Sequence, residues 1–136
     1  MKTILIKLSV ITFCFLALGT SVVAQSSVYY QLRDGNPNYP NPPHSFEAFI
    51  AVWDNNTNSQ YGATQGPQTQ YAGQYNPVYT TITLPSDDLP RWRIIIQVNE
   101  KDNNGTIIAT QYRQSGLLTT AQYEAGGIPL NGITFN

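Results

Sequence analysis

The sequence has few cysteines and few charges, and each shortage excludes a class of protein. Its one cysteine, Cys14, lies inside an apolar run near the N-terminus, so the rest of the chain can form neither a disulfide framework nor a thiol active site. Charged residues make up only 11% of the chain, and they include no cluster of basic residues. This lack argues against nucleic-acid binding and against electrostatic docking on anionic lipid.

Residues suited to catalysis are also scarce. His44 is the only histidine, and it has no second histidine or nearby cysteine with which to share a metal and no Gly-x-Ser-x-Gly motif around it. Asp87 and Asp88 are adjacent, so on an extended chain their side chains point to opposite sides and cannot act together as a glycosidase pair. We therefore interpret the chain as a protein that is not an enzyme.

The first 24 residues have the pattern of a secretory signal peptide. Two lysines and an apolar run over residues 8–18 precede a small-residue cleavage site that ends at Ala24. The apolar run is shorter than a membrane-spanning helix requires. We expect a secreted protein, extracellular or periplasmic, with no transmembrane segment after cleavage and a single domain over residues 25–136.

Alternating apolar and polar residues predict short β-strands along this domain, most clearly from Trp92 to Val98. No stretch has helical periodicity over three turns, and turn residues recur between the strands, as in Asn103-Asn104-Gly105. We therefore predict an all-β fold, a single antiparallel β-sandwich of about six to eight strands. The expected strands are residues 27–33, 46–53, 78–84, 92–98 and 106–112, with a closing strand near the C-terminus that contains Ile128, Leu130, Ile133 and Phe135.

Three segments leave the details of this sandwich open. Residues 61–75 are rich in Gly, Gln and Tyr and are compatible with a short strand at 68–71 or with a loop. Residues 117–123 are compatible with a short strand or a helical turn. The strand at 46–53 is apolar on both sides, so it is either central and covered or displays an aromatic stripe; we expect it to be covered.

The order of the central elements resembles the C-two domain, the β-sandwich of protein kinase C and synaptotagmin that binds calcium and phospholipid. Asn76-Pro77-Val78-Tyr79 resembles the motif that opens one strand of that family, and residues 84–89 resemble its connector rich in proline and acid. Residues 94–98, followed by Glu100 and Asp102, resemble the next strand with its acidic end.

This resemblance, which spans residues 46–110, implies a calcium site on the rim loops with Asp34, Glu100 and Asp102 as its ligands. Calcium takes about six to eight oxygen ligands, and the family's other acidic positions are missing here, so such a site would bind calcium weakly. Bound calcium would in turn hold a lipid or polymer headgroup. No other cofactor is expected.

A second hypothesis rests on tyrosine. Tyr61, Tyr71, Tyr75 and Tyr79 lie close together in the sequence, interspersed with Gln and Asn. Aromatic faces beside amides bind sugars and proteins, although the same residues also occur in ordinary sandwich packing. The chain is therefore interpreted as a binding module, either calcium-dependent at the rim or specific for a glycan or protein through this tyrosine-rich surface or a sheet edge.

Overall fold

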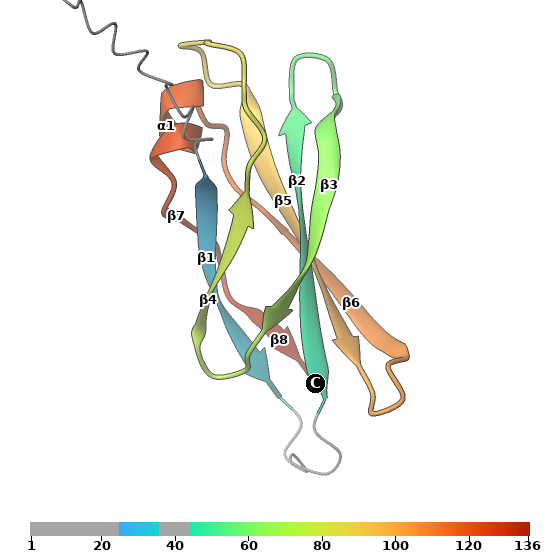
Figure 1. Ribbon diagram of the computed structural model, residues 1–136. Coiled ribbons are helices and arrows are strands. Elements are labelled where there is room, and N and C mark those ends of the chain that lie inside the picture. The colour runs from blue at the N-terminus through green and yellow to red at the C-terminus, as the bar shows by residue number, and fades with distance from the viewer. Residues whose placement is uncertain (1–24, 36–43) are drawn as a thin grey trace, which may run out of the picture.

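The computed structural model describes residues 25–35 and 44–136, which form two β-sheets packed face to face (Figure 1). One sheet has the strand order β3-β2-β5-β6, and the other has the order β4-β1-β7, with β8 also paired to β1. This confirms the predicted all-β sandwich. The strands are β1 (Ser26–Asp34), β2 (Ser45–Asp54), β3 (Ser59–Gln70), β4 (Tyr75–Thr80), β5 (Trp92–Lys101), β6 (Ile107–Gln114), β7 (Ile128–Pro129) and β8 (Ile133–Phe135).

The first and last strands of the domain lie side by side. β1 pairs antiparallel with β4 but parallel with both β7 and β8, whereas every pairing within the β3-β2-β5-β6 sheet is antiparallel. The predicted closing strand is therefore present as two short pieces, on either side of residues 130–132. The predicted signal peptide and residues 36–43 of the proline-rich loop lie outside the described residues.

The core lies between the two sheets and consists of the apolar sides of the alternating strands. Each large apolar side chain buried there stabilises the fold by about 1.5–3 kcal/mol. Trp92 is among the largest of the fully buried side chains, and the Tyr61 ring packs edge-on against it at 5.1 Å between centroids. At the opposite end, the rings of Phe46 and Phe135 lie 5.5 Å apart and join the two sheets.

β3 is much longer than the short strand considered for residues 61–75. Its residues are mostly polar and exposed, and two of its amides, those of Gln65 and Gln68, bond to residues 79–81. Gln68 both donates to the Tyr79 carbonyl (2.8 Å) and accepts from the Tyr79 N–H (2.9 Å). Gln65 donates to the Thr81 hydroxyl (3.0 Å) and accepts from the Thr81 N–H (2.9 Å). These amides connect β3 to β4 across the edge of the sandwich.

The ambiguous segment near residue 120 forms helix α1 (Thr120–Ala125). Thr119 begins the helix with a capping box, in which its hydroxyl accepts from the Gln122 N–H (3.2 Å) and its own N–H donates to the Gln122 side chain (2.9 Å). The buried Tyr123 then anchors the helix to the core. Within the described ranges, no helix is long and apolar enough to cross a membrane.

Candidate functional site

The outer face of the β3-β2-β5-β6 sheet carries an open row of aromatic side chains. β2 is central, as predicted, because it pairs with both β3 and β5. Its outer side is not covered, contrary to expectation: Phe49, Ala51 and Trp53 are only half-buried. No second layer lies on this face within the described chain, so these side chains are accessible to a ligand.

Strand register assembles a groove around the smallest of these residues. Ala51 lies opposite Ile95 on β5, and Phe49 lies opposite Gln97, which in turn lies opposite Tyr112 on β6. The rings of Phe49, Trp53 and Tyr112 therefore surround a low floor. We call this site the aromatic groove; it has a volume of about 180 Å³ and is lined by Phe49, Ala51, Trp53, Gln60, Thr64, Ile95, Gln97 and Tyr112.

The aromatic groove continues across β6 toward the C-terminal segment. A second depression of about 430 Å³ shares Ile95 and Tyr112 with the aromatic groove and is also lined by Arg113, Gln114 and Asn131. The two depressions thus form one elongated surface that is apolar at the β2 end and polar at the β6 end. This shape suits a chain-like ligand better than a compact one.

Several polar groups of the aromatic groove are available for hydrogen bonding. The Gln97 amide donates to Asn99 (2.9 Å), but its carbonyl accepts no hydrogen bond from a described residue. Neither the Trp53 indole N–H nor the Tyr112 hydroxyl bonds to any other part of the described chain. The aromatic groove therefore offers donors and acceptors directly beside its rings.

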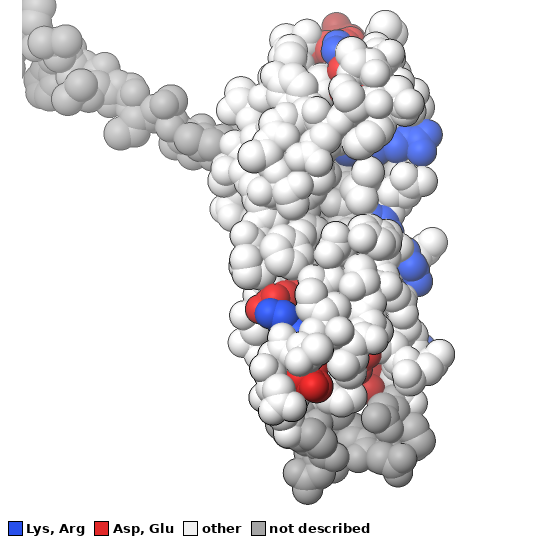
Figure 2. Space-filling model, turned by 90° about the vertical axis from the view of Figure 1, so that its right-hand side faces the viewer, with Lys and Arg blue, Asp and Glu red and all other residues white. Residues whose placement is uncertain are grey.

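The surface around the aromatic groove carries little charge, and what it carries is basic. No acidic residue lines it. Arg93 lies next to Trp53 in the strand register and Arg113 lines the polar end, and neither forms an ion pair within the described residues. Figure 2, which shows the side at the right of Figure 1, likewise presents a mostly uncharged surface with isolated charged groups.

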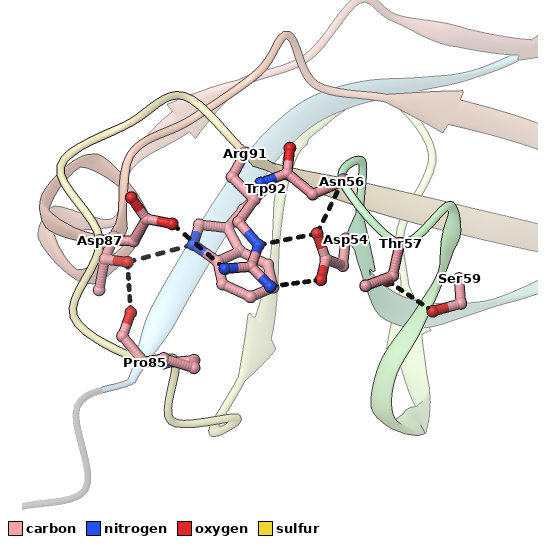
Figure 3. Close-up of polar contacts among 9 residues, drawn as sticks. Asp54, Asn56, Thr57, Ser59, Pro85, Asp87, Arg91 and Trp92 are labelled. Atoms are coloured by element: carbon pink, nitrogen blue, oxygen red, sulfur yellow. Dashed lines mark hydrogen bonds and ion pairs between the residues drawn. The ribbon is translucent and has the colours of Figure 1, made fainter.

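A second polar cluster, around Arg91, is fully occupied by its own contacts (Figure 3). Arg91 donates to both carboxylate oxygens of Asp54 (2.8 and 2.7 Å) and to Asp87 (3.2 Å), and its guanidinium lies 4.7 Å from the centre of the Trp92 ring. The hydrogen bonds from Arg91 hold the pKa of Asp54 well below its ordinary range. Because these groups are satisfied by one another, the cluster fastens the 81–91 connector rather than binding a ligand.

The three predicted calcium ligands lie at the same end of the sandwich, but each of the two on β5 and its turn has a protein partner. Glu100 is 5% exposed and pairs with His44. The Asp102 carboxylate accepts from the N–H groups of Asn104 and Thr106 (2.8 Å each) and shapes the turn. No group of three His, Cys, Asp or Glu side chains that could hold a metal occurs in the described chain. The calcium site, including Asp34, stays a prediction.

The four predicted tyrosines do not form one surface. Tyr61 packs on the core, whereas Tyr71 and Tyr75 are exposed near the turn between β3 and β4. Tyr79 lies farther along β4, and Tyr75 lines a separate depression of about 310 Å³ on the β4-β1 sheet. A ligand surface formed by these tyrosines stays a prediction, whereas the aromatic groove combines residues of distant strands.

Comparison with known proteins finds no matching family model, no matching curated protein and no matching solved structure. The resemblance to the C-two domain therefore stays a prediction, and the site is interpreted from its own geometry.

Proposed function

We propose that this chain is a secreted, non-catalytic binding module that holds a glycan chain in the aromatic groove. The observation that carries the proposal is the arrangement of three rings, Phe49, Trp53 and Tyr112, around the floor formed by Ala51 and Ile95. The C–H face of a sugar ring packs against aromatic faces, and its hydroxyls need nearby hydrogen-bonding partners. Here those partners are the free groups of Gln97, Trp53 and Tyr112.

The rigidity of the sheet supports the same function. The central strands β2 and β5 are hydrogen-bonded on both sides, so their outward side chains stand on a backbone that needs no ordering when a ligand binds. A preorganised surface loses less conformational entropy on binding. The elongated shape and the low charge of the groove favour a polymer with many hydroxyls over a compact ionic ligand.

A glycan array followed by calorimetry tests the proposal. We expect Trp53→Ala and Tyr112→Ala each to weaken binding by about 10- to 30-fold, since a central aromatic contact contributes about 1.5–2 kcal/mol. Tyr75→Ala and Tyr71→Ala, which remove exposed tyrosines outside the aromatic groove, are matched controls and should leave affinity unchanged.

Tryptophan fluorescence provides a second readout in the same samples. Trp92 is fully buried and Trp53 lines the aromatic groove, so a bound sugar should change the emission of Trp53 alone. Trp53→Phe should abolish the change while retaining most of the affinity, because the ring remains. A chain that binds no glycan class, or whose affinity survives both alanine variants, would contradict the proposal.

A further inference from the structure

β6 is an edge strand that exposes three large apolar or aromatic side chains. It pairs with β5 on one side only and projects with the β5–β6 turn from the body of the sandwich (Figure 1). Ile107, Ile108 and Tyr112 on this strand are 52%, 49% and 59% exposed. Exposed apolar edge strands pair readily with further strands unless they are covered or charged.

The backbone of β6 has hydrogen-bonding groups free along this edge. Ser115 N–H donates to the Ile94 carbonyl, so the antiparallel register directs residues 113, 111 and 109 toward β5. Thr110 and Tyr112 must then direct their N–H and C=O groups away from β5. Of these, only the Tyr112 carbonyl has a partner in the described chain, the Arg113 side chain, and a carbonyl can accept a second bond.

The opposite edge of the same sheet, formed by β3, bonds through its side chains to the segment that contains residues 79–81. On β3, the Gln68 side chain bonds to the Tyr79 backbone and the Gln65 side chain bonds to the Thr81 N–H and hydroxyl, so residues 79–81 are held beside that edge. On β6, the side chains of Gln111 and Arg113 reach carbonyls near β8, but they leave the strand's own outward N–H groups without a partner among the described residues.

We propose that β6 pairs antiparallel with β6 of a second copy of this chain, centred on Thr110. In this register Thr110 lies opposite Thr110 of the other copy, and Ile108 lies opposite Tyr112, twice by symmetry. Threonine pairs and pairs of aromatic with β-branched residues are favourable cross-strand neighbours, each contributing about 0.2–1 kcal/mol. The two aromatic grooves would then share one continuous sheet, although the pairing does not depend on what they bind.

Charge complementarity favours an antiparallel pairing with a second copy. Residues 106–112 carry no charge, so no like charges meet along the paired strands. The nearest unpaired charges are Asp102 at the start of the turn and Arg113 at the end of β6, since Lys101 already pairs with Glu47. Antiparallel pairing brings Arg113 of each copy near the Asp102 turn of the other, whereas parallel pairing would bring the two Arg113 side chains together.

The mass of the protein in solution, measured by light scattering over a range of concentrations, tests this inference. We expect a reversible dimer in the parent chain and a monomer in Thr110→Pro, which removes one free N–H of the edge. Ile108→Lys, which places a charge on the paired strand, should also be monomeric. Leu89→Lys changes an apolar residue outside β6 that is even more exposed than Ile108, and this variant should remain dimeric.

Disulfide trapping tests the register without relying on a destabilised variant. In a Cys14→Ser chain, Thr110→Cys places two cysteines directly opposite each other at a Cα separation of about 5.5 Å, which suits a disulfide. Thr106→Cys lies far from its symmetry mate and should not cross-link. A monomer at every concentration, a dimer that survives both Thr110→Pro and Ile108→Lys, or equal cross-linking of the two cysteine variants would each overturn the proposal.

Discussion

Arg91 donates two hydrogen bonds to Asp54, a residue 37 positions earlier in the chain. Asp54 ends β2 directly after Trp53, and Arg91 precedes β5, whose first residue, Trp92, lies opposite Asp54 in the register. The pair therefore fastens the two central strands together at the Trp53 end of the aromatic groove.

The Asp54–Arg91 pair predicts a loss of stability in acid. Hydrogen bonds from Arg91 lower the pKa of Asp54 below its ordinary value of 3.8, so the fold favours the charged carboxylate. The resulting stabilisation is complete above that value and disappears as the pH falls below it, because protonation then favours the unfolded chain. Thermal unfolding from pH 7 to pH 2 should therefore show a fall in melting temperature that is shallower in Asp54→Asn, which starts lower at pH 7.

Asp88→Asn is the matched control for this measurement, since Asp88 is exposed and makes no contact with Arg91. It should follow the parent curve at every pH. Parallel acid curves for the parent chain and Asp54→Asn would show that Asp54 contributes nothing to the pH dependence.

The close approach of Gly66 to β2 links the stability of the fold to ligand binding in the aromatic groove. Its φ is +132°, and a Cβ there would lie 2.7 Å from the Ala48 carbonyl and 3.1 Å from the Phe49 side chain. Gly66→Ala should therefore destabilise the fold by about 1–3 kcal/mol and also weaken ligand binding by displacing Phe49.

Gly116→Ala is the control, because no atom lies within 4 Å of a Cβ at Gly116. Its stability in urea should remain within about 1 kcal/mol of the parent. Equal effects of the two substitutions would argue against a specific close approach at Gly66.

The amide pairs between β3 and residues 79–81 predict that a half-buried glutamine, Gln68, stabilises the fold. Gln68→Ala removes both hydrogen bonds to the Tyr79 backbone and should cost about 1–2 kcal/mol. The measurement is the midpoint of urea unfolding at an unchanged slope. Gln74→Ala, at an exposed residue whose side chain makes no hydrogen bond in the described chain, should leave the midpoint unchanged. If the two midpoints agree, the amide pairs contribute nothing to stability.

The contacts of Glu100 and Asp102 predict the response to calcium. To coordinate a metal, Glu100 would have to leave His44, and Asp102 would have to share the oxygen that forms the turn. We therefore expect millimolar calcium to leave the melting temperature unchanged. A rise that disappears in Asp102→Asn would instead support the calcium site implied by the C-two resemblance.

Local patterns were sufficient for most of the strands and for several turns. Alternation identified both central strands and the buried faces that begin at Phe46 and Trp92, because burial of one side imposes a period of two. The Thr119-x-x-Gln122 spacing could also have identified helix α1, since the capping box is a local signal. The full length of β3 was not predicted, because its stabilising contacts are amide hydrogen bonds, which leave no apolar pattern in the sequence.

Alternation along each strand is enough to tell which side chains share a face: Phe49, Ala51 and Trp53 on one strand, and Ile95 with Gln97 on another. That these faces adjoin and that Tyr112 completes them follows from the folded chain alone, because strand order and register arise from contacts between distant segments. The same distinction applies to Tyr61 and Tyr75, which are close in sequence but are separated by the strand that runs between them. Period along a strand is a local property, whereas adjacency between strands is a property of the whole core.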